Sequence, residues 1–348
     1  MCNIAGYVGS NQAAPLLLEM IRRQQWLDGG MSTGIATIHE GKLYCRKVVG
    51  DVDTLIRETD ALDLPGTIGI AHTRPAGGDP LKPFHPFLSM DGKTALVTNG
   101  FTPPSKYSPM WDEAANFLKD NGVTYLHECK NINNESPRLK GTDNYITPAE
   151  VRVHLVDYYL KQGKTPAEAM ALTSTRMYSD NVTVTITEYD PARIHLLRTT
   201  RPMTAVMENS ESYIATCSFA YPETLASKAF DLPLFHSVAV STDGITISPH
   251  KVDVEHVSEI TPRMYHLCYQ RIEALLKSDE APVFYNDLER EVLALENFWP
   301  NGYTYKQQAR LVYDMLWQFH SEGRLHWETR VQETKEFPRT RYFVWLDK

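Results

Sequence analysis

Two neighbouring helical segments in the middle of a β-rich region set the strongest limit on the fold of this chain. Residues 148–162 and 166–178 each carry Pro in the first turn, where its missing N–H would have no partner within the helix. Short runs rich in apolar residues come before and after these helices and favour strands. Strands, then two helices, then strands indicate two sheets covered by helices, an α+β layered fold. The predicted strands are residues 4–8, 33–38, 42–48, 67–72, 94–98, 181–188, 193–198, 204–207, 212–216, 237–241 and 246–248.

The chain changes character from residue 255 onward. Three helical segments are followed there by two strands with a charged turn between them, which is the element order of a winged-helix module. Four of the six tryptophans lie in this part, so it can form its own core. We therefore predict one domain over residues 1–250 and a small winged-helix-like domain over residues 255–348. The predicted C-terminal elements are helices at 262–277, 285–295 and 304–322 and strands at 324–331 and 341–346.

Composition and charge restrict the class of protein. The 348 residues are 42% hydrophobic and 22% charged, as in an ordinary globular enzyme. The net charge of -8 argues against a broad surface for nucleic acid or anionic membrane, which would need a basic excess. From Lys251 onward 13 Lys and Arg face 16 Asp and Glu, a balance of -3, so packing or protein docking is favoured over nucleic-acid binding for the C-terminal part. No apolar run approaches the ~20 residues that cross a bilayer, and no signal peptide is predicted.

The five cysteines are far apart, and no C-x-x-C pair occurs among them. This spacing suggests neither a zinc site nor a disulfide framework. We expect a reducing cytoplasm as the location of the protein, and no metal or organic cofactor.

One of these cysteines, Cys2, directly follows the initiator Met1. Removal of Met1 would leave a thiol and a free α-amine on one residue. The amine has a reference pKa of about 7.7–8.0 and can act as the base that activates the thiol. An N-terminal nucleophile with its own amine is a known variant of nucleophile–base catalysis. Taken alone, a small residue at position 2 can also be a chance start of a strand.

Three ordered motifs resemble those of the class II glutamine amidotransferases, the N-terminal-nucleophile hydrolases that include the glutaminase domains of glucosamine-6-phosphate synthase, amidophosphoribosyltransferase, asparagine synthetase and glutamate synthase. The first, at Cys2, resembles the family start Cys-Gly-Ile-x-Gly. The second, ending in Arg74, resembles Gly-His-Thr-Arg, and the third, ending in Asn99-Gly100, resembles Val-x-His-Asn-Gly. The resemblance covers about residues 2–250 and implies a four-layer αββα sandwich. The motifs read Cys2-Asn3-Ile4-Ala5-Gly6, Ala71-His72-Thr73-Arg74 and Leu96-Val97-Thr98-Asn99-Gly100.

The resemblance implies a role for each motif residue in hydrolysing the side-chain amide of glutamine. Cys2 would be the nucleophile, and Asn99 with Gly100 would form the oxyanion hole that stabilises the tetrahedral intermediates. Arg74 would bind the α-carboxylate of glutamine with two parallel N–H bonds. Asp143 would bind the α-ammonium, provided that a short insertion follows it.

Each role has a plainer alternative. Asn99-Gly100 is also a favoured hairpin dipeptide, and an arginine such as Arg74 commonly forms a surface salt bridge. Asp143 can simply lie in a polar loop, because alignment without a gap places Pro148 at its position. His72 and His85 are near the motifs, and we interpret them as structural rather than as bases.

Several positions depart from the family pattern. Asn3 replaces the usual Gly, Pro75 follows Arg74, and residues 26–30 (Trp-Leu-Asp-Gly-Gly) stand where the family has Arg-Gly. These departures leave the nucleophile and the oxyanion hole in place but change the loops expected around the substrate.

The expected function is therefore release of glutamate and ammonia from glutamine. The residues after the glutaminase region are too few for the usual acceptor domain, and no G-x-x-x-x-G-K-[ST] phosphate loop occurs, so we expect the ammonia to pass to a separate synthase subunit. Two alternatives stay open: an N-terminal-cysteine acylase acting on another amide, and a catalytically weak protein that binds glutamine for regulation. The oligomeric state stays open as well, a homo-oligomer included.

Overall fold

Two antiparallel sheets form the centre of the fold. The computed structural model describes residues 2–75, 84–100, 108–130, 136–249, 260–295, 299, 306–333 and 339–347. The first sheet has seven strands in the order β13-β11-β12-β1-β4-β2-β3, and the second has six in the order β15-β14-β10-β9-β6-β5. The first sheet consists of β1 (Asn3–Val8), β2 (Gly30–His39), β3 (Lys42–Val49), β4 (Ile68–Pro75), β11 (Thr204–Glu208), β12 (Glu211–Ala215) and β13 (Phe230–Asp231). The second consists of β5 (Phe87–Leu88), β6 (Thr94–Gly100), β9 (Asn181–Thr187), β10 (Asp190–Arg198), β14 (His236–Ser241) and β15 (Gly244–Pro249).

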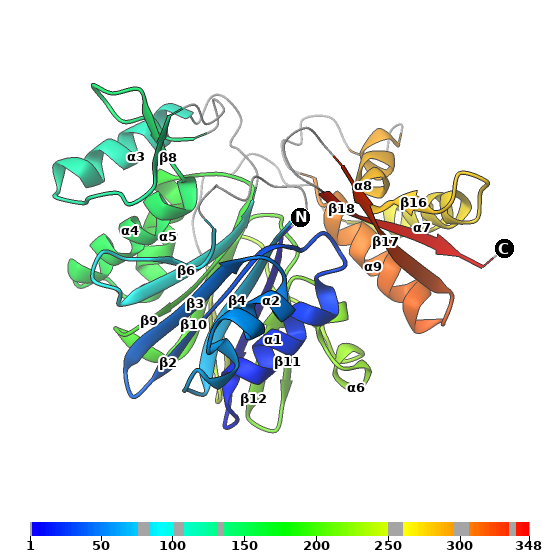
Figure 1. The fold of residues 1–348 in the computed structure, drawn as a ribbon, viewed down its shortest axis with the longest axis horizontal. Coiled ribbons are helices and arrows are strands. Elements are labelled where there is room, and N and C mark those ends of the chain that lie inside the picture. Colours follow the sequence, from blue (N-terminus) through cyan, green and yellow to red (C-terminus); the bar gives the residue numbers. More distant parts are fainter. Residues whose placement is uncertain are drawn as a thin grey trace.

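Helices cover the outer faces of both sheets (Figure 1). On the first sheet lie α1 (Ala13–Gln24) and α2 (Val52–Glu58), and on the second lie α4 (Pro148–Lys161) and α5 (Pro166–Arg176). One apolar core joins the inner faces of the two sheets, and separate cores join each sheet to its helices. The layers therefore run helix, sheet, sheet, helix. The predicted α+β class is confirmed, and the strand pairs of both sheets are antiparallel.

Strand β1 shows how the sequence produces these layers. All six of its residues are buried, because Ile4 and Val8 face the core between the sheets while Ala5 and Tyr7 face α1. A strand covered on both faces reads as a continuous apolar run rather than as an alternation. Gly6 fits between the sheets because a Cβ there would lie 2.6 Å from Ile214.

The two central helices begin as the sequence predicts, with Pro in the first turn. Thr165 and Glu168 close a capping box on α5, in which each side chain bonds the backbone of the other. The remaining elements outside the C-terminal part are α3 (Ser108–Asp120), α6 (Glu223–Ala226), the hairpin of β7 (Glu128–Lys130) and β8 (Asn144–Ile146), and 3-10 turns at Ala61–Asp63 and Ser218–Ala220.

The C-terminal part combines three helices with a three-stranded sheet of order β16-β18-β17. We call the described residues from 260 onward the C-terminal unit. It lies to the right in Figure 1, with its last two strands drawn in red. The predicted hairpin between the last two strands forms, with Leu325 opposite Leu346 and Gln332 opposite Arg339. The elements are α7 (Pro262–Leu276), β16 (Val283–Phe284), α8 (Tyr285–Ala294), α9 (Gln308–Ser321), β17 (Leu325–Gln332) and β18 (Arg339–Leu346).

The C-terminal unit has a core, as the sequence suggests, but shares it with the rest of the chain. Trp26, Leu27, Cys217 and Phe219 belong to the same buried cluster as the side chains of α7, α8 and α9. The ring of Trp26 stacks on Trp327 with centroids 4.4 Å apart. The segment that follows α1 therefore packs against both the turn around Phe219 and the C-terminal unit.

A half-buried group of charges also joins the two parts. Arg310 of α9 pairs with Asp231 of β13, and its Nε lies 3.6 Å from Asp314. Burial raises the pKa of Asp314 to about 7, and the negative charge of Asp231 adds to the rise, while Arg310 and Arg198 oppose it. The carboxyl group of Asp314 therefore ionises less readily in the folded protein than in the unfolded chain.

This charge group predicts a pH-dependent stability. The raised pKa favours the folded state at low pH, and that advantage is lost as the pH rises toward 7, the pKa of folded Asp314. Asp314→Asn keeps the neutral form at every pH, so we expect it to be more stable than wild type at pH 8.5 by about 1–2 kcal/mol. Denaturant unfolding at pH 5 and at pH 8.5 measures this. A variant that is less stable at pH 8.5, or equally shifted at both pH values, contradicts the interpretation.

Candidate active site

Cys2 lies at the start of β1, the central strand of the first sheet. The neighbouring strands fix this position: Asn3 is paired with Thr73 of β4, and the N–H of Ile4 donates to Oγ1 of Thr216 at 2.8 Å. The Cys2 residue is half-buried. The strand thus brings the thiol to the end of the sandwich where β4 and β6 also end.

Asn99 and Gly100 form the end of β6, in the second sheet. Nδ2 of Asn99 donates to the carbonyl oxygen of Cys2 at 2.6 Å and lies 3.5 Å from Oγ1 of Thr216. Both residues are paired with β9, Asn99 with Val182 and Gly100 with Asn181. They therefore belong to a strand and are not the central residues of a two-residue hairpin turn.

Gly100 occupies a place where no side chain fits. A Cβ there would lie 2.7 Å from Cβ of Asn181 and 3.0 Å from the carbonyl oxygen of Asp180. Glycine thus lets the end of β6 approach β9 closely, directly after the amide of Asn99.

Arg74 lies near the end of β4, opposite Ser32 of β2. Its positive charge lowers the pKa of the Cys2 thiol, and its neighbour Thr73 is paired with Asn3, the residue after Cys2. The structure therefore brings Cys2, Asn99 and Arg74 to one end of the sandwich, from three different strands.

The surroundings of Cys2 disfavour a free thiolate. Burial raises the pKa of the Cys2 thiol to about 11, and the charge of Asp28 adds to this, while the amino terminus and Arg74 lower it. A thiol with this pKa is almost fully protonated at neutral pH, so attack on an amide needs a base close to it.

The two histidines near the motifs are not suited to that role. Burial lowers the pKa of His72 well below its ordinary value and lowers that of His85 to about 3. Their rings lie 4.2 Å apart, and His85 also contacts Phe87. Both histidines are therefore weak bases, poorly suited to take the proton of the Cys2 thiol. Nδ1 of His85 lies 3.4 Å from the carbonyl oxygen of Leu96 in β6.

Asp143 is located elsewhere. It is exposed in the turn before β8, where its charge acts on Arg138. Figure 1 shows β8 beside α3, away from the amino terminus. Strand β8 lies between Asp143 and the start of α4. Binding of the glutamine ammonium by Asp143 stays a prediction.

Two residues that the motifs did not single out approach Cys2. Thr216 bonds the backbone of Ile4 and lies beside the Asn99 amide. Asp28 is buried, and its charge acts on the Cys2 thiol. The only sequence signal for Asp28 was its place before Gly29-Gly30, where the expected Arg-Gly is missing.

Three further features of the described residues concern metal binding, membrane insertion and disulfide formation. They contain no group of three or more His, Cys, Asp or Glu side chains that could hold a metal ion. None of the helices among them is both long and apolar enough to span a bilayer. Cys2, Cys45, Cys217 and Cys268 carry free thiols.

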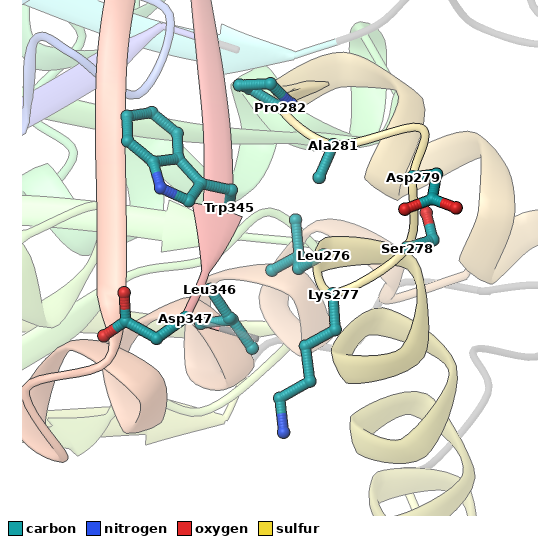
Figure 2. A pocket seen from close by; sticks show the side chains of 9 residues that line it. All are labelled: Leu276, Lys277, Ser278, Asp279, Ala281, Pro282, Trp345, Leu346 and Asp347. Carbon is teal, nitrogen blue, oxygen red and sulfur yellow. The ribbon is translucent and has the colours of Figure 1, made fainter.

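A cavity of about 380 Å³ opens between the end of α7 and the end of β18. Figure 2 shows Leu276, Ala281 and Trp345 around this hollow, while the side chain of Lys277 extends away from it. None of its lining residues belongs to the predicted site, so this cavity is separate from Cys2.

The site and fold define a layered α+β protein with a cysteine near the amino terminus. No protein-family model matches the chain. Curated relatives do: it is 28% identical over 218 residues to glutamine–fructose-6-phosphate aminotransferase (isomerizing) of Pyrococcus horikoshii, with 62% of this chain and 32% of that protein covered. The protein of the same name from Caldanaerobacter subterraneus is 30% identical over 218 residues, with 62% and 31% covered. The one from Shewanella oneidensis is 27% identical over 282 residues, with 80% and 39% covered.

Solved structures share the fold. Glutamine phosphoribosylpyrophosphate amidotransferase from B. subtilis matches 74% of this chain and 50% of its own, with a TM-score of 0.56 and 15% identity. A structure described as the allosteric regulatory enzyme of purine biosynthesis matches 81% of this chain and 58% of its own, with a TM-score of 0.59 and 16% identity. At this identity the likeness concerns the fold alone.

These findings confirm the resemblance drawn from the motifs: the chain is a relative of the class II glutamine amidotransferases, which are enzymes. The chain spans about a third of the length of the curated relatives it matches.

Proposed function

We propose that this protein hydrolyses the side-chain amide of glutamine, with Cys2 as an N-terminal nucleophile after removal of Met1. The observation that carries the proposal is the 2.6 Å hydrogen bond from Nδ2 of Asn99 to the backbone of Cys2. From this position, the side-chain amide of Asn99 can donate to the carbonyl oxygen of the glutamine amide while the Cys2 thiol attacks its carbon.

The reaction follows from the chemistry of these groups. The α-amine of Cys2 takes the thiol proton, and sulfur adds to the amide carbon of glutamine. Asn99 and the N–H of Gly100 stabilise the resulting oxyanion, and ammonia leaves with the proton that the amine carried. Water then attacks the thioester through a second oxyanion and releases glutamate. A retained Met1 would turn the amine into an amide and leave the thiol without this base.

Arg74 is proposed to bind the α-carboxylate of the substrate, because it follows Thr73, which is paired with Asn3 beside Cys2, and because its charge acts on the Cys2 thiol. Arg74→Lys keeps the charge but not the planar pair of donors. We expect it to raise the KM for glutamine by about 10-fold with a smaller effect on kcat, since one charge-assisted hydrogen bond is lost. Steady-state measurement of glutamate release tests this. An unchanged KM would show that Arg74 does not contact the substrate.

We further propose that the ammonia is transferred to an acceptor on a partner synthase subunit. The names of the similar proteins, an aminotransferase and an amidotransferase, support transfer of the nitrogen rather than simple hydrolysis. Full activity of the chain alone, together with purification from its host without a synthase, would contradict this. A reducing cytoplasm is proposed as the location, because the five cysteines are far apart in the chain and include no C-x-x-C pair.

The boundaries 1–250 and 255–348 are proposed as those of the glutaminase domain and a winged-helix module. The order of α7, β16, α8, α9, β17 and β18 supports this interpretation of the C-terminal unit. Its core, shared with Trp26 and Phe219, favours a packing role for the module over an independent one.

One observation favours a second candidate, a protein that binds glutamine without turning it over. The pKa of the Cys2 thiol is raised to about 11, and a thiol that stays protonated does not attack the amide of a bound glutamine. Glutamine binding without release of glutamate by protein that has lost Met1 would support this second function.

A further inference from the structure

We propose that Arg152 of α4 is a positioning residue that holds a positive charge one side chain away from Gly100 of the oxyanion hole. The proposal rests on the proposed function and adds to it a residue outside the three motifs. Attack of a thiol on an amide develops negative charge on the amide oxygen. Fixed positive charge near that oxygen lowers the energy of the transition state.

The guanidinium of Arg152 is bound to the segment that enters β9. Helix α4 packs on β6 in the second sheet (Figure 1), and only 3% of Arg152 is exposed. Its Nη2 donates to the carbonyl oxygen of Met177 and to Oγ of Ser179, both at 2.7 Å. The amide of Asn181, the first residue of β9, suits these neighbours only with its oxygen toward Arg152. This oxygen then accepts from Nη1 at 2.9 Å and from Nη2 at 3.1 Å.

Asn181 in turn packs directly on Gly100. The two residues are paired across β9 and β6, and a Cβ on Gly100 would lie 2.7 Å from Cβ of Asn181. Because Gly100 has no side chain, nothing separates the end of β6 from Asn181. The guanidinium is therefore joined to the proposed oxyanion hole through the single side chain of Asn181.

The backbone of Asn181 also determines where the N–H of Gly100 points. The N–H of Asn181 donates to Oγ1 of Thr199 at 2.6 Å, and its carbonyl oxygen accepts from the N–H of Thr199 at 2.7 Å. Both groups thus point toward β10, so Asn181 and Gly100 face each other without mutual hydrogen bonds. Gly100 therefore turns its N–H away from β9, where the oxygen of a substrate amide can accept from it.

No carboxylate among the described residues pairs with Arg152. Its guanidinium contacts a carbonyl, a hydroxyl and an amide oxygen, and its Cζ lies 5.4 Å from the centre of the Trp111 ring. Burial lowers the pKa of Arg152 to about 9, which leaves the group charged at neutral pH. Burial of a cation among neutral partners costs free energy, and an uncharged side chain would avoid this cost. The charge is therefore better explained by a role at Gly100 than by stability.

Two substitutions separate the charge of Arg152 from its hydrogen bonds. Arg152→Gln keeps an N–H donor without the charge, and Arg152→Lys keeps the charge. We expect Arg152→Gln to lower kcat for glutamine by about 10-fold with little change in KM, less than the loss of a direct oxyanion donor would cause. Arg152→Lys should stay within about 3-fold of the wild-type kcat, because the charge still acts through the protein interior. Steady-state release of glutamate measures both.

A third substitution tests the charge without removing the arginine. Asn181→Asp keeps the shape of the side chain and its bond to Arg152, but places a negative charge beside the guanidinium. We expect it to lower kcat by about 10-fold, although thermal unfolding should show a fold at least as stable as wild type. A purely structural role of Arg152 would leave kcat unchanged in this variant.

Arg176→Gln is the matched control. Arg176 of α5 also lies over an aromatic ring, with 4.1 Å between its Cζ and the centre of the Phe117 ring. This variant should keep the wild-type kcat. A wild-type kcat in Arg152→Gln or Asn181→Asp, or an equal loss in Arg152→Gln and Arg152→Lys, overturns the assignment while leaving the glutaminase function intact. If wild type without Met1 does not hydrolyse glutamine, the proposed function itself fails, and this assignment fails with it.

Discussion

Replacing Cys2 with alanine is expected to lower the rate of glutamine hydrolysis by about 10⁴-fold or more, because removal of a nucleophile abolishes the covalent route altogether. The fold should survive, since Cys2 precedes β1 and is only half-buried. The measurement is ammonia release at saturating glutamine, together with thermal unfolding of both proteins.

The matched control for this variant is Cys45→Ala. Cys45 lies in β3, opposite Ala36 of β2 and away from the start of β1. Burial raises the pKa of its thiol to about 11, as at Cys2, so a raised pKa alone does not mark a nucleophile. Cys45→Ala should keep wild-type turnover. Equal loss in both variants, or full activity in Cys2→Ala, would show that another group attacks the amide.

The second large effect is expected at Asn99. Removing one oxyanion donor typically lowers kcat by about 10²- to 10³-fold, because the donor acts only when negative charge develops on the amide oxygen. We expect this loss for Asn99→Ala, with the KM for glutamine changed by much less. The comparison of kcat with KM is informative because loss of a residue that only binds substrate would raise KM instead.

Asn144→Ala is a suitable control for Asn99→Ala. Nδ2 of Asn144 donates to Glu128 at 2.7 Å in the hairpin of β7 and β8. This variant also loses an amide hydrogen bond, but outside the proposed site. Wild-type kcat for Asn99→Ala would remove Asn99 from the oxyanion hole and leave its bond to Cys2 as a structural feature of the fold.

Local sequence patterns predicted much of the fold. The apolar run of β1 indicated a buried strand, and Pro148 and Pro166 indicated the first turns of α4 and α5. These predictions succeeded because they depend on residues that are close in the chain. The motif ending in Asn99-Gly100 identified the end of a strand that meets Cys2, because the resemblance carried long-range information that periodicity lacks.

Contacts between distant segments were not predictable in this way. Trp26 and Trp327 stack although about 300 residues separate them, and neither position has a local signal for that contact. The shared core of the C-terminal unit was missed for the same reason. Asp28 was seen only as a departure from the family pattern, since its approach to Cys2 depends on packing against β4 and the C-terminal unit.

The central claim is that Cys2, exposed as the first residue, is the nucleophile for glutamine. Intact-mass measurement after treatment with 6-diazo-5-oxo-norleucine, a glutamine analogue that alkylates such nucleophiles, tests it most directly. The account predicts a chain that has lost Met1 and carries one adduct, and no adduct on Cys2→Ala. A processed wild-type chain without an adduct, or an adduct that persists in Cys2→Ala, would contradict the account.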